Sequence, residues 1–346
     1  MAELLAAQLT DIPARRLTVV HVSEPVPPPG KALVKVDACG ICGTDLHLMD
    51  GLSFTPSLPF IPGHELVGTV VAVGASADER WLGSRVTATI FEGCGICDEC
   101  RSGDERLCTS MVGVLGLFAT SGAYAEYAVV PTRHLIPVPA SLSSVRVACV
   151  VDAGPTARNA LRVIEGRLHS GGIVVVGAGP VGFLVAQLLG RTAVDPLIVE
   201  PNDLRRSAVA NGRRRVARGL DEVEDRPNVV IECSGAEEVV RWAVGALRPH
   251  GTLVAIGFPT LSQLSFLPVV RKELRIIGVR SGTTADLVEI LDLAADGRLA
   301  LPQITEWGLD GINDALEVLR SGGAPGKCVI VTQSQVTSSP SQRDSV

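Results

Sequence analysis

The pattern of apolar and polar residues changes at about residue 140 of this 346-residue chain. Before that point, short β-branched runs bounded by Gly and Pro recur, and such runs are typical of strands. They cover residues 17–22, 32–36, 66–73, 85–90 and 124–130. The first 140 or so residues are therefore predicted to form a small β-barrel with long loops.

After residue 141, strand-like and helix-like segments alternate. Apolar runs predict strands at residues 173–176, 197–199, 229–231, 253–256 and 274–279. Helical periodicity predicts helices between them at residues 181–189, 203–211 and 237–247, and later ones at 284–295 and 312–319. This alternation predicts βαβ units and an α/β fold with a parallel sheet covered on both faces. A last strand at 327–332 can return to the first domain.

Composition restricts the possible partners. The formal net charge is −6, and the one basic run, Arg213 to Arg215, is followed by acids, so we expect no nucleic acid partner. The N-terminus lacks a basic n-region, and the uncharged residues 171–190 are interrupted by Gly and Pro, so we expect neither a signal peptide nor a membrane span. Nine cysteines, partly clustered, favour metal binding in a reducing compartment over a disulfide scaffold. These features predict a soluble cytoplasmic protein.

Four cysteines lie within fifteen residues. They are Cys94, Cys97, Cys100 and Cys108. Four thiolates complete a tetrahedral zinc and leave no place for a substrate, so this site is predicted to be structural. A reducing compartment disfavours a disulfide, and the charged residues between the thiols disfavour idle buried cysteines. An iron–sulfur cluster is disfavoured because nothing else in the chain suggests electron transfer.

A glycine-rich turn indicates a nucleotide. The apolar strand at 173–176 runs directly into the sequence Gly177-Ala178-Gly179-Pro180-Val181-Gly182, which opens a predicted helix. The first Gly allows the turn, the second lets the backbone approach a pyrophosphate, and the third lets helix pack on strand. Glu200 ends the next strand, and its carboxylate would accept hydrogen bonds from the hydroxyls of the adenine ribose, which favours NAD over NADP. Arg205, which we count among the cofactor-binding residues, and Arg206 lie nearby and weaken that preference.

A second set of metal-ligand types lies between residues 39 and 65. It comprises Cys42, Thr44, His47, His64 and Glu65. A thiolate and an imidazole suit zinc, and a hydroxyl beside a second imidazole suits proton transfer. Two such ligands are too few for a catalytic zinc, which normally has three from the protein. Cys149 and Asp152 are the candidates for the third, and Cys149 is the more typical ligand.

These motifs, in this order, resemble those of the zinc-dependent medium-chain alcohol dehydrogenases over about residues 15–332. The resemblance implies a GroES-like β-barrel catalytic domain and a Rossmann domain with a doubly wound parallel sheet. The implied boundaries are 1–150 for the catalytic domain with its zinc lobe at 94–108, 151–290 for the NAD-binding domain, and 291–332 for the return to the catalytic domain. Residues 333–346 are expected to form a disordered tail.

The resemblance also implies the roles of single residues. A ligand four residues before a Thr maps onto Asp152, because the Thr is matched by Thr156. Cys42, His64 and Asp152 would hold a catalytic zinc, with Glu65 close enough to assist or exchange. Asp45 would fix the tautomer of His64. Thr44 would accept the alcohol proton and pass it through the cofactor ribose to His47, while hydride goes to NAD.

Two departures from the family pattern are visible. Asn228 stands where an acid is usual before the fourth Rossmann strand, and the segment from Asn211 to Val229 is too short for a full strand plus helix. Both concern the adenine side of the nucleotide pocket and the edge of the sheet.

The predicted activity is reversible oxidation of a primary or secondary alcohol with NAD, using two zinc ions per chain. Apolar residues near the ligands hint at an apolar alcohol or carbonyl substrate: Leu46, Leu48, Phe54, Leu58, Phe60 and Phe91. The alternatives are a polyol or amino-alcohol (sorbitol- or threonine-type) dehydrogenase and, in another class, a non-catalytic nucleotide-binding redox sensor. We expect a homodimer or homotetramer, with Rossmann sheets paired edge to edge near residues 276–279.

Overall fold

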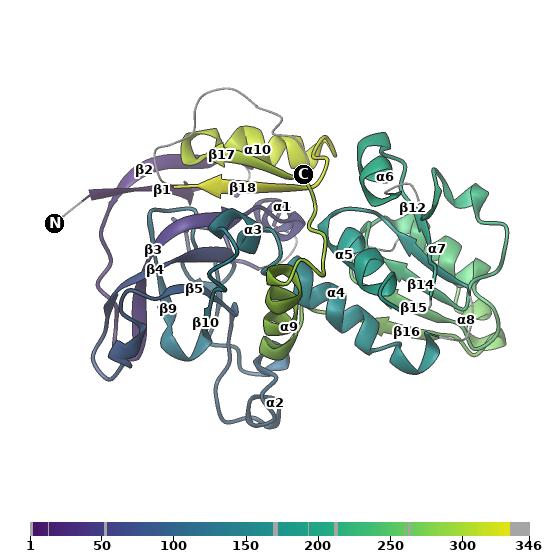
Figure 1. Ribbon diagram of the computed structural model, residues 1–346, viewed down its shortest axis with the longest axis horizontal. Helices are drawn as coiled ribbons and strands as arrows, with labels where there is room; N and C mark the ends of the chain where they lie inside the picture. Colours follow the sequence, from purple (N-terminus) through teal and green to yellow (C-terminus); the bar gives the residue numbers. More distant parts are fainter. Residues whose placement is uncertain are drawn as a thin grey trace. The chain divides into compact units, whose positions relative to one another are not determined.

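The computed structural model describes residues 3–12, 14–51, 54–168, 172–192, 194–210, 214–259, 261 and 264–332. It divides into two compact units (Figure 1). The first unit is Met1–Val151 with Ile304–Val346, and the second unit is Asp152–Gln303. The predicted return to the first domain began at residue 291, but the structure keeps residues up to 303 in the second unit. The predicted tail, 333–346, lies outside the described residues.

A seven-stranded mixed sheet forms the framework of the first unit. Its path is β10 (Leu135–Pro137), β5 (Arg85–Ala88), β4 (Glu65–Val73), β3 (Lys31–Gly40), β18 (Lys327–Val331) and β17 (Ile304–Gly308), with β9 (Tyr127–Pro131) also paired to β3. Separate from it are the antiparallel pair β1 (Glu3–Leu9) and β2 (Leu17–Ser23), and the small sheet of β6 (Phe91–Glu92), β7 (Gly113–Leu115) and β8 (Ala119–Thr120).

Strand β3 is long enough to pair with three others. One edge pairs with β4, while the other pairs first with β9, through Lys31 to Lys35, and then with β18, through Ala38 to Gly40. Figure 1 accordingly shows the yellow C-terminal strand β18 together with the purple N-terminal strands. The return of the last strand to the first domain is thus present, as predicted. Strand β3 leads into α1 (Gly43–Met49).

The second unit contains a six-stranded parallel sheet. The strand order is β13 (Arg215–Ala217), β12 (Leu197–Val199), β11 (Ile173–Val176), β14 (Val229–Glu232), β15 (Thr252–Ala255) and β16 (Arg275–Gly278). In order of sequence this is 3-2-1-4-5-6, the doubly wound arrangement, in which a ligand binds where the order reverses. That switch point lies between β11 and β14.

The helices of the second unit agree with most of the predicted ones. They are α4 (Ala153–Arg162), α5 (Pro180–Leu189), α6 (Asp203–Ala210), α7 (Glu237–Ala246), α8 (Leu267–Arg271) and α9 (Thr284–Ala295). The short interval before Val229 contains the third strand of the sheet, β13. In place of a following helix, the described residues 214–228 contain only a 3-10 turn, Leu220–Glu222. The first unit contains α2 (Asp98–Arg101), α3 (Ser144–Ala148) and α10 (Ile312–Arg320) besides α1.

Apolar residues fill each unit. In the first, a core cluster extends from the β3–β4 pair to α10, which contributes Ile312 and Leu316. In the second, all four residues of β11 are buried, as expected of a central parallel strand. Among the described residues, no helix has the combined length and hydropathy that crossing a membrane requires.

Candidate functional site

Helix α1 presents the first predicted ligand at its N-terminus. Cys42 is the N-cap residue, and its backbone N–H donates to Oδ2 of Asp45, three positions on, at 2.8 Å. This is half of a capping box, which fixes the entry into the helix. The Cys42 thiol in turn lies 3.5 Å from the Thr44 hydroxyl. The helix therefore holds a thiol, a hydroxyl and a buried carboxylate close together.

His64 approaches the same carboxylate from the loop before β4. Its ring is buried, and its Nδ1 lies 3.3 Å from Asp45 Oδ1. A metal-binding histidine commonly uses its second nitrogen in this way, which leaves Nε2 for the metal. Donor atoms of Cys42, His64 and Glu65 all lie within 4.8 Å of one another. The structure thus brings together three of the residues predicted to surround the catalytic metal.

The electrostatics of His64 favour a positive charge on its ring. Burial opposes the charged form, but Asp45 and then Cys42 outweigh it and raise the pKa of His64 well above its ordinary value. For Asp45, burial is again outweighed, here by His64, so the pKa of the carboxyl is lowered. A thiolate, an imidazole and nearby carboxylates form the donor set that suits zinc, whose charge can replace a proton on the ring. The residues present fit that metal.

Glu65 occupies a more constrained position. It is fully buried, and its Oε1 accepts a hydrogen bond from Nζ of Lys327 on β18. Its Oε2 lies over Gly40, where an added Cβ would come within 1.8 Å of that oxygen. Only glycine at position 40 leaves room for this carboxylate. Glu65 therefore combines proximity to the predicted ligands with an ion pair to Lys327.

His47 lies three residues after Thr44 on α1. Burial lowers the pKa of its ring, Arg320 acts in the same direction, and Asp50 opposes them. His47 is consequently neutral near pH 7 and can accept a proton. This state suits the relay role that the resemblance implies.

The sequence left Cys149 and Asp152 as alternatives for the third ligand. Cys149 is fully buried in the first unit, and burial raises the pKa of its thiol to about 12. Among the described residues of the first unit, Cys149 is not part of the group whose donor atoms lie within 4.8 Å of one another around Cys42, His64 and Glu65. Asp152 is the first residue of the second unit and directly follows Val151, where the N-terminal segment of the first unit ends. Within the second unit, Ser281 Oγ donates to Asp152 Oδ1 at 3.4 Å.

The four-cysteine cluster is assembled as predicted. The sulfur atoms of Cys94, Cys97, Cys100 and Cys108 lie within 4.8 Å of one another. Cys108 Sγ accepts backbone N–H groups of Cys94 and Ser110, each at 3.3 Å. Backbone N–H donation, first from Cys100, lowers the pKa of Cys97 to about 6. The pKa of Cys94 is also lowered, chiefly by the backbone N–H of Ile96, whereas desolvation raises the pKa of Cys100 to about 12. The four sulfur atoms are close enough to share one ion, so the cluster fits a structural zinc.

The glycine-rich turn lies at the end of β11. Gly177 has a φ of +93°, in the left-handed region, and an added Cβ on Gly182 would lie 1.8 Å from the Gly177 carbonyl oxygen. A Cβ on Gly179 would meet nothing within 4 Å, so this side of the turn is open to a ligand. The three glycines therefore have the spatial properties predicted for a pyrophosphate-binding turn.

Glu200 is already engaged with this turn. Its Oε2 accepts a hydrogen bond from the backbone N–H of Ala178, with an N–O distance of 2.7 Å, and its Oε1 accepts one from the backbone N–H of Asn202 at 2.9 Å. Arg205 Nε lies 3.3 Å from the same carboxylate, whereas Arg206 donates to the Glu200 carbonyl oxygen. Glu200 thus braces the nucleotide turn in addition to its predicted contact with ribose.

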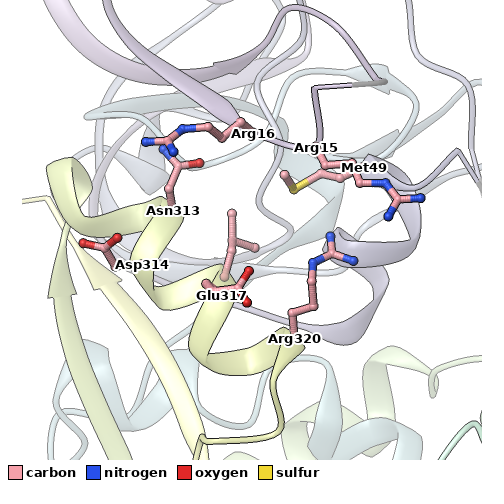
Figure 2. Close-up of a pocket in the computed structure, with 8 residues that line it drawn as sticks. Arg15, Arg16, Met49, Asn313, Asp314, Glu317 and Arg320 are labelled. Atoms are coloured by element: carbon pink, nitrogen blue, oxygen red, sulfur yellow. The ribbon is translucent and has the colours of Figure 1, made fainter.

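A pocket of about 190 Å³ lies in the first unit, behind the C-terminal end of α1 (Figure 2). In Figure 2, Arg15 and Arg320 extend toward the same side of it. Both pair with Asp50, at 3.2 and 2.9 Å. The lining of the pocket is mostly charged: Arg15, Arg16, Met49, Asn313, Asp314, Leu316, Glu317 and Arg320. The pocket's ion pairs anchor the end of the helix that carries His47.

Sequence reasoning missed Tyr124, Lys327, Asp50 and Arg320. All except Asp50, which caps α1, reach the site from distant parts of the chain: Tyr124 is 79 residues from Asp45, and Lys327 is 262 residues from Glu65. A local spacing pattern cannot reveal such pairs. The one available signal was Lys327 itself, a single cation at the head of an otherwise apolar strand.

Comparison with known proteins agrees with this geometry. Residues 28–140 match the alcohol dehydrogenase GroES-like domain, and residues 206–296 match the zinc-binding dehydrogenase family. An alcohol dehydrogenase from a Moraxella species is 31% identical over 91% of this chain and 95% of its own length. An L-threonine 3-dehydrogenase from Pyrococcus abyssi is also 31% identical, over 96% of this chain and 99% of its own length.

Among solved structures, acetophenone reductase from Geotrichum candidum in complex with NAD superimposes with a TM-score of 0.88. Its sequence identity is 26%, over 96% of this chain and 98% of that one. The sequence identities, the matched domains and the shared fold lead to one conclusion: the chain belongs to the zinc-dependent medium-chain alcohol dehydrogenase family.

Proposed function

We propose that the protein transfers hydride between an alcohol and NAD at a zinc ion held by Cys42, His64 and Asp152. The observation that carries the proposal is the meeting of Cys42, His64 and Glu65 donor atoms within 4.8 Å, with His64 oriented by a buried Asp45. When bound, zinc supplies the Lewis acidity that lowers the pKa of the alcohol, and NAD accepts the hydride.

Asp152 is the third ligand in this proposal. Asp152 is joined by a peptide bond to Val151, which is buried in the first unit. The Cα atoms of Asp152 and Val151 are therefore about 3.8 Å apart, however the units are oriented. Cys149 lies outside the group of donor atoms around Cys42, His64 and Glu65, which argues against the alternative. One thiolate and one carboxylate balance the charge of the dication.

Thr44 and His47 move the proton. The Thr44 hydroxyl lies 3.5 Å from the Cys42 sulfur and would accept the proton from the alcohol. Burial lowers the pKa of His47, so its imidazole would be neutral and able to take the proton up in turn. Gly177, Gly179 and Gly182, together with Pro180 and Val181 at the start of α5, would hold the pyrophosphate of NAD, and Glu200 and Arg205 would hold its adenine ribose.

An apolar alcohol or carbonyl compound is the proposed substrate. Three of the apolar residues that suggested such a substrate are buried in the core, so core packing accounts for them: Leu48, Phe60 and Phe91. Leu46 and Phe54 are only partly buried and remain available to line a substrate site. The similarity to both alcohol and L-threonine dehydrogenases keeps amino alcohols and polyols as the second candidate.

Metal content and turnover test the proposal together. Wild type should hold two zinc ions per chain and form NADH with alcohols, whereas Cys42→Ser should hold one and lose at least about 100-fold in activity. Cys39→Ala is the matched control, because Cys39 is fully buried and its pKa is raised well above the ordinary value by burial. A wild-type protein with one zinc and no turnover would instead support a non-catalytic nucleotide-binding protein.

The same assay identifies the substrate class. A panel of aliphatic and benzyl-type alcohols, polyols and threonine, each with NAD, should give the highest kcat/KM for an apolar alcohol. A preference for threonine or a polyol would select the second candidate.

Assembly and location complete the proposal. β16 is an edge strand on which Ile276 is 43% exposed. Shortly before it in the chain, Phe266, Leu267 and Val270 are between 54% and 71% exposed. An exposed apolar strand edge is a site for pairing with a second strand. We therefore propose a homo-oligomer in which β16 pairs with its copy. The clustered free thiols support a reducing, cytoplasmic location.

A further inference from the structure

Tyr124 is a fully buried phenol whose hydroxyl lies next to the candidate metal centre. It is among the largest fully buried side chains of the described residues. Its hydroxyl lies 2.8 Å from Asp45 Oδ2 and 3.3 Å from the carbonyl oxygen of Gly40. A buried phenol needs a hydrogen-bond partner, and an ionised carboxylate is a stronger acceptor than a carbonyl. Burial and then Asp45 raise the pKa of Tyr124, so the group stays protonated and donates.

Asp45 connects this phenol to both metal ligands of the first unit. Its Oδ2 accepts from the Tyr124 hydroxyl and from the Cys42 N–H, each at 2.8 Å. Its Oδ1 faces His64 Nδ1 at 3.3 Å. The carboxylate is therefore fixed from three directions, and the orientation of His64 depends on where it is fixed. Tyr124 supplies the one side-chain hydroxyl among these contacts.

The backbone around Tyr124 holds its ring in place. Its N–H donates to the Pro62 carbonyl oxygen at 3.0 Å, and the Ala123 N–H donates to that of Gly63 at 2.8 Å. Gly63, directly before His64, has a φ of +98°, and an added Cβ there would lie 2.6 Å from the Tyr124 ring. The ring thus packs on the loop that delivers His64, while the hydroxyl reaches α1. One side chain spans the two segments that carry the ligands.

We propose that Tyr124 is a positioning residue of the catalytic zinc site, which acts on His64 through Asp45. The inference rests on the proposed function. By donating to Asp45, the phenol fixes the carboxylate rotamer and withdraws electron density from it. Both effects define the orientation and basicity of the His64 ring toward the metal. Loss of the hydroxyl should therefore weaken zinc binding at this site and alter its geometry without removing any ligand.

Tyr124→Phe tests this, because it removes only the hydroxyl and keeps the ring against Gly63. In competition with a chelator, the catalytic zinc of this variant should bind about tenfold more weakly, while the four-cysteine site is unchanged. With Co²⁺ in place of zinc, its visible spectrum should shift relative to wild type. A loss of fold stability alone would move neither the spectrum nor the relative affinity of the two sites.

Two comparisons make the test specific. Tyr127→Phe is the matched control, because Tyr127 is the only other tyrosine of the chain and packs on the separate cluster of Leu4, Ala6 and Ala125. Asp45→Asn provides the background for a double-mutant cycle, in which adding Tyr124→Phe should change the zinc affinity no further.

The outcomes are distinct. Wild-type zinc affinity and cobalt spectrum in Tyr124→Phe, or an equal loss of affinity in the Asp45→Asn background, would overturn the role of Tyr124 and leave the proposed function intact. A wild-type protein that binds only the structural zinc would overturn the proposed function, and this inference with it.

Discussion

At the scale of single residues, the charge of His47 depends on Asp50 and Arg320 as well as on burial. Asp50 caps α1 and pairs with both Arg15 and Arg320, two residues that line the pocket of Figure 2. Of these, Arg320 lowers the pKa of His47 and Asp50 raises it, in addition to the larger effect of burial. A relay histidine must be neutral to accept a proton, so activity should fall as the pH drops through its pKa.

Substitutions on the two sides of this ion pair should shift the pH profile in opposite directions. Arg320→Gln removes a cation, raises the pKa of His47 and should move the acid limb of kcat to higher pH. Asp50→Asn should move it to lower pH. The measurement is kcat against pH with saturating alcohol and NAD, and Arg15→Gln, which removes only the more exposed partner of Asp50, is the control. Shifts of the same sign in both variants would contradict the relay role of His47.

Residues of the site differ in how far the sequence alone could predict them. The cysteines from Cys94 to Cys108 were predictable, because a local spacing specifies their geometry. Cys42 and His64 were predictable as ligand types, but their meeting depends on β3 and β4 being adjacent. Tyr124 and Lys327 were not predictable, because what matters about them is a buried partner far along the chain.

At the scale of elements, the βαβ pattern predicted five of the six strands of the parallel sheet, all except β13, and most helices of the second unit. Helix α4 was missed, because Gly154 and Pro155 in its first turn disguise it. Proline is tolerated there, since the first N–H groups of a helix have no intrahelical partner. Gly154 has a packing reason, because a Cβ at that position would lie 2.5 Å from Ile290 on α9. The residues that hide this helix from a propensity argument are those that fit it into the unit.

The nucleotide turn gives a prediction at this scale. Gly182→Ala should destabilise the protein by about 3 kcal/mol, because the new methyl group collides with the backbone oxygen of Gly177. Gly179→Ala should cost no more than about 1 kcal/mol, because its Cβ enters open space, but it should weaken NADH binding. Urea unfolding and NADH fluorescence titration measure the two effects. Equal losses of stability in both variants would refute the different roles assigned to these glycines.

At the scale of the whole molecule, the proposed assembly depends on the edge of the parallel sheet. No residue of α8 is buried, and β16 has a free side along the described residues 275–278. Ile276 is 43% exposed on that strand. Such an edge, if left uncovered, promotes uncontrolled strand pairing, so a defined partner copy also protects the fold.

Ile276→Arg should dissociate the oligomer, because it places an unpaired charge at the contact, at a cost of about 2 kcal/mol or more per copy. Light scattering coupled to size exclusion should report a monomer at micromolar concentration. Leu82→Arg is the matched control, since Leu82 is 47% exposed and lies in the first unit. An unchanged mass for Ile276→Arg would exclude β16 as the interface.

The pairing of β18 with the second half of β3 has a consequence for how the protein is made. Ile330 lies opposite Cys39, so β18 closes a sheet whose strand β3 is synthesised about 290 residues earlier. The four-cysteine lobe is local in sequence and can load its metal on the ribosome. The ligand-bearing loops around Cys42 and His64 must wait for Lys327 to neutralise Glu65 beneath them. Nascent chains of this enzyme should therefore acquire their structural metal first and their catalytic competence only after β18 has emerged from the ribosome.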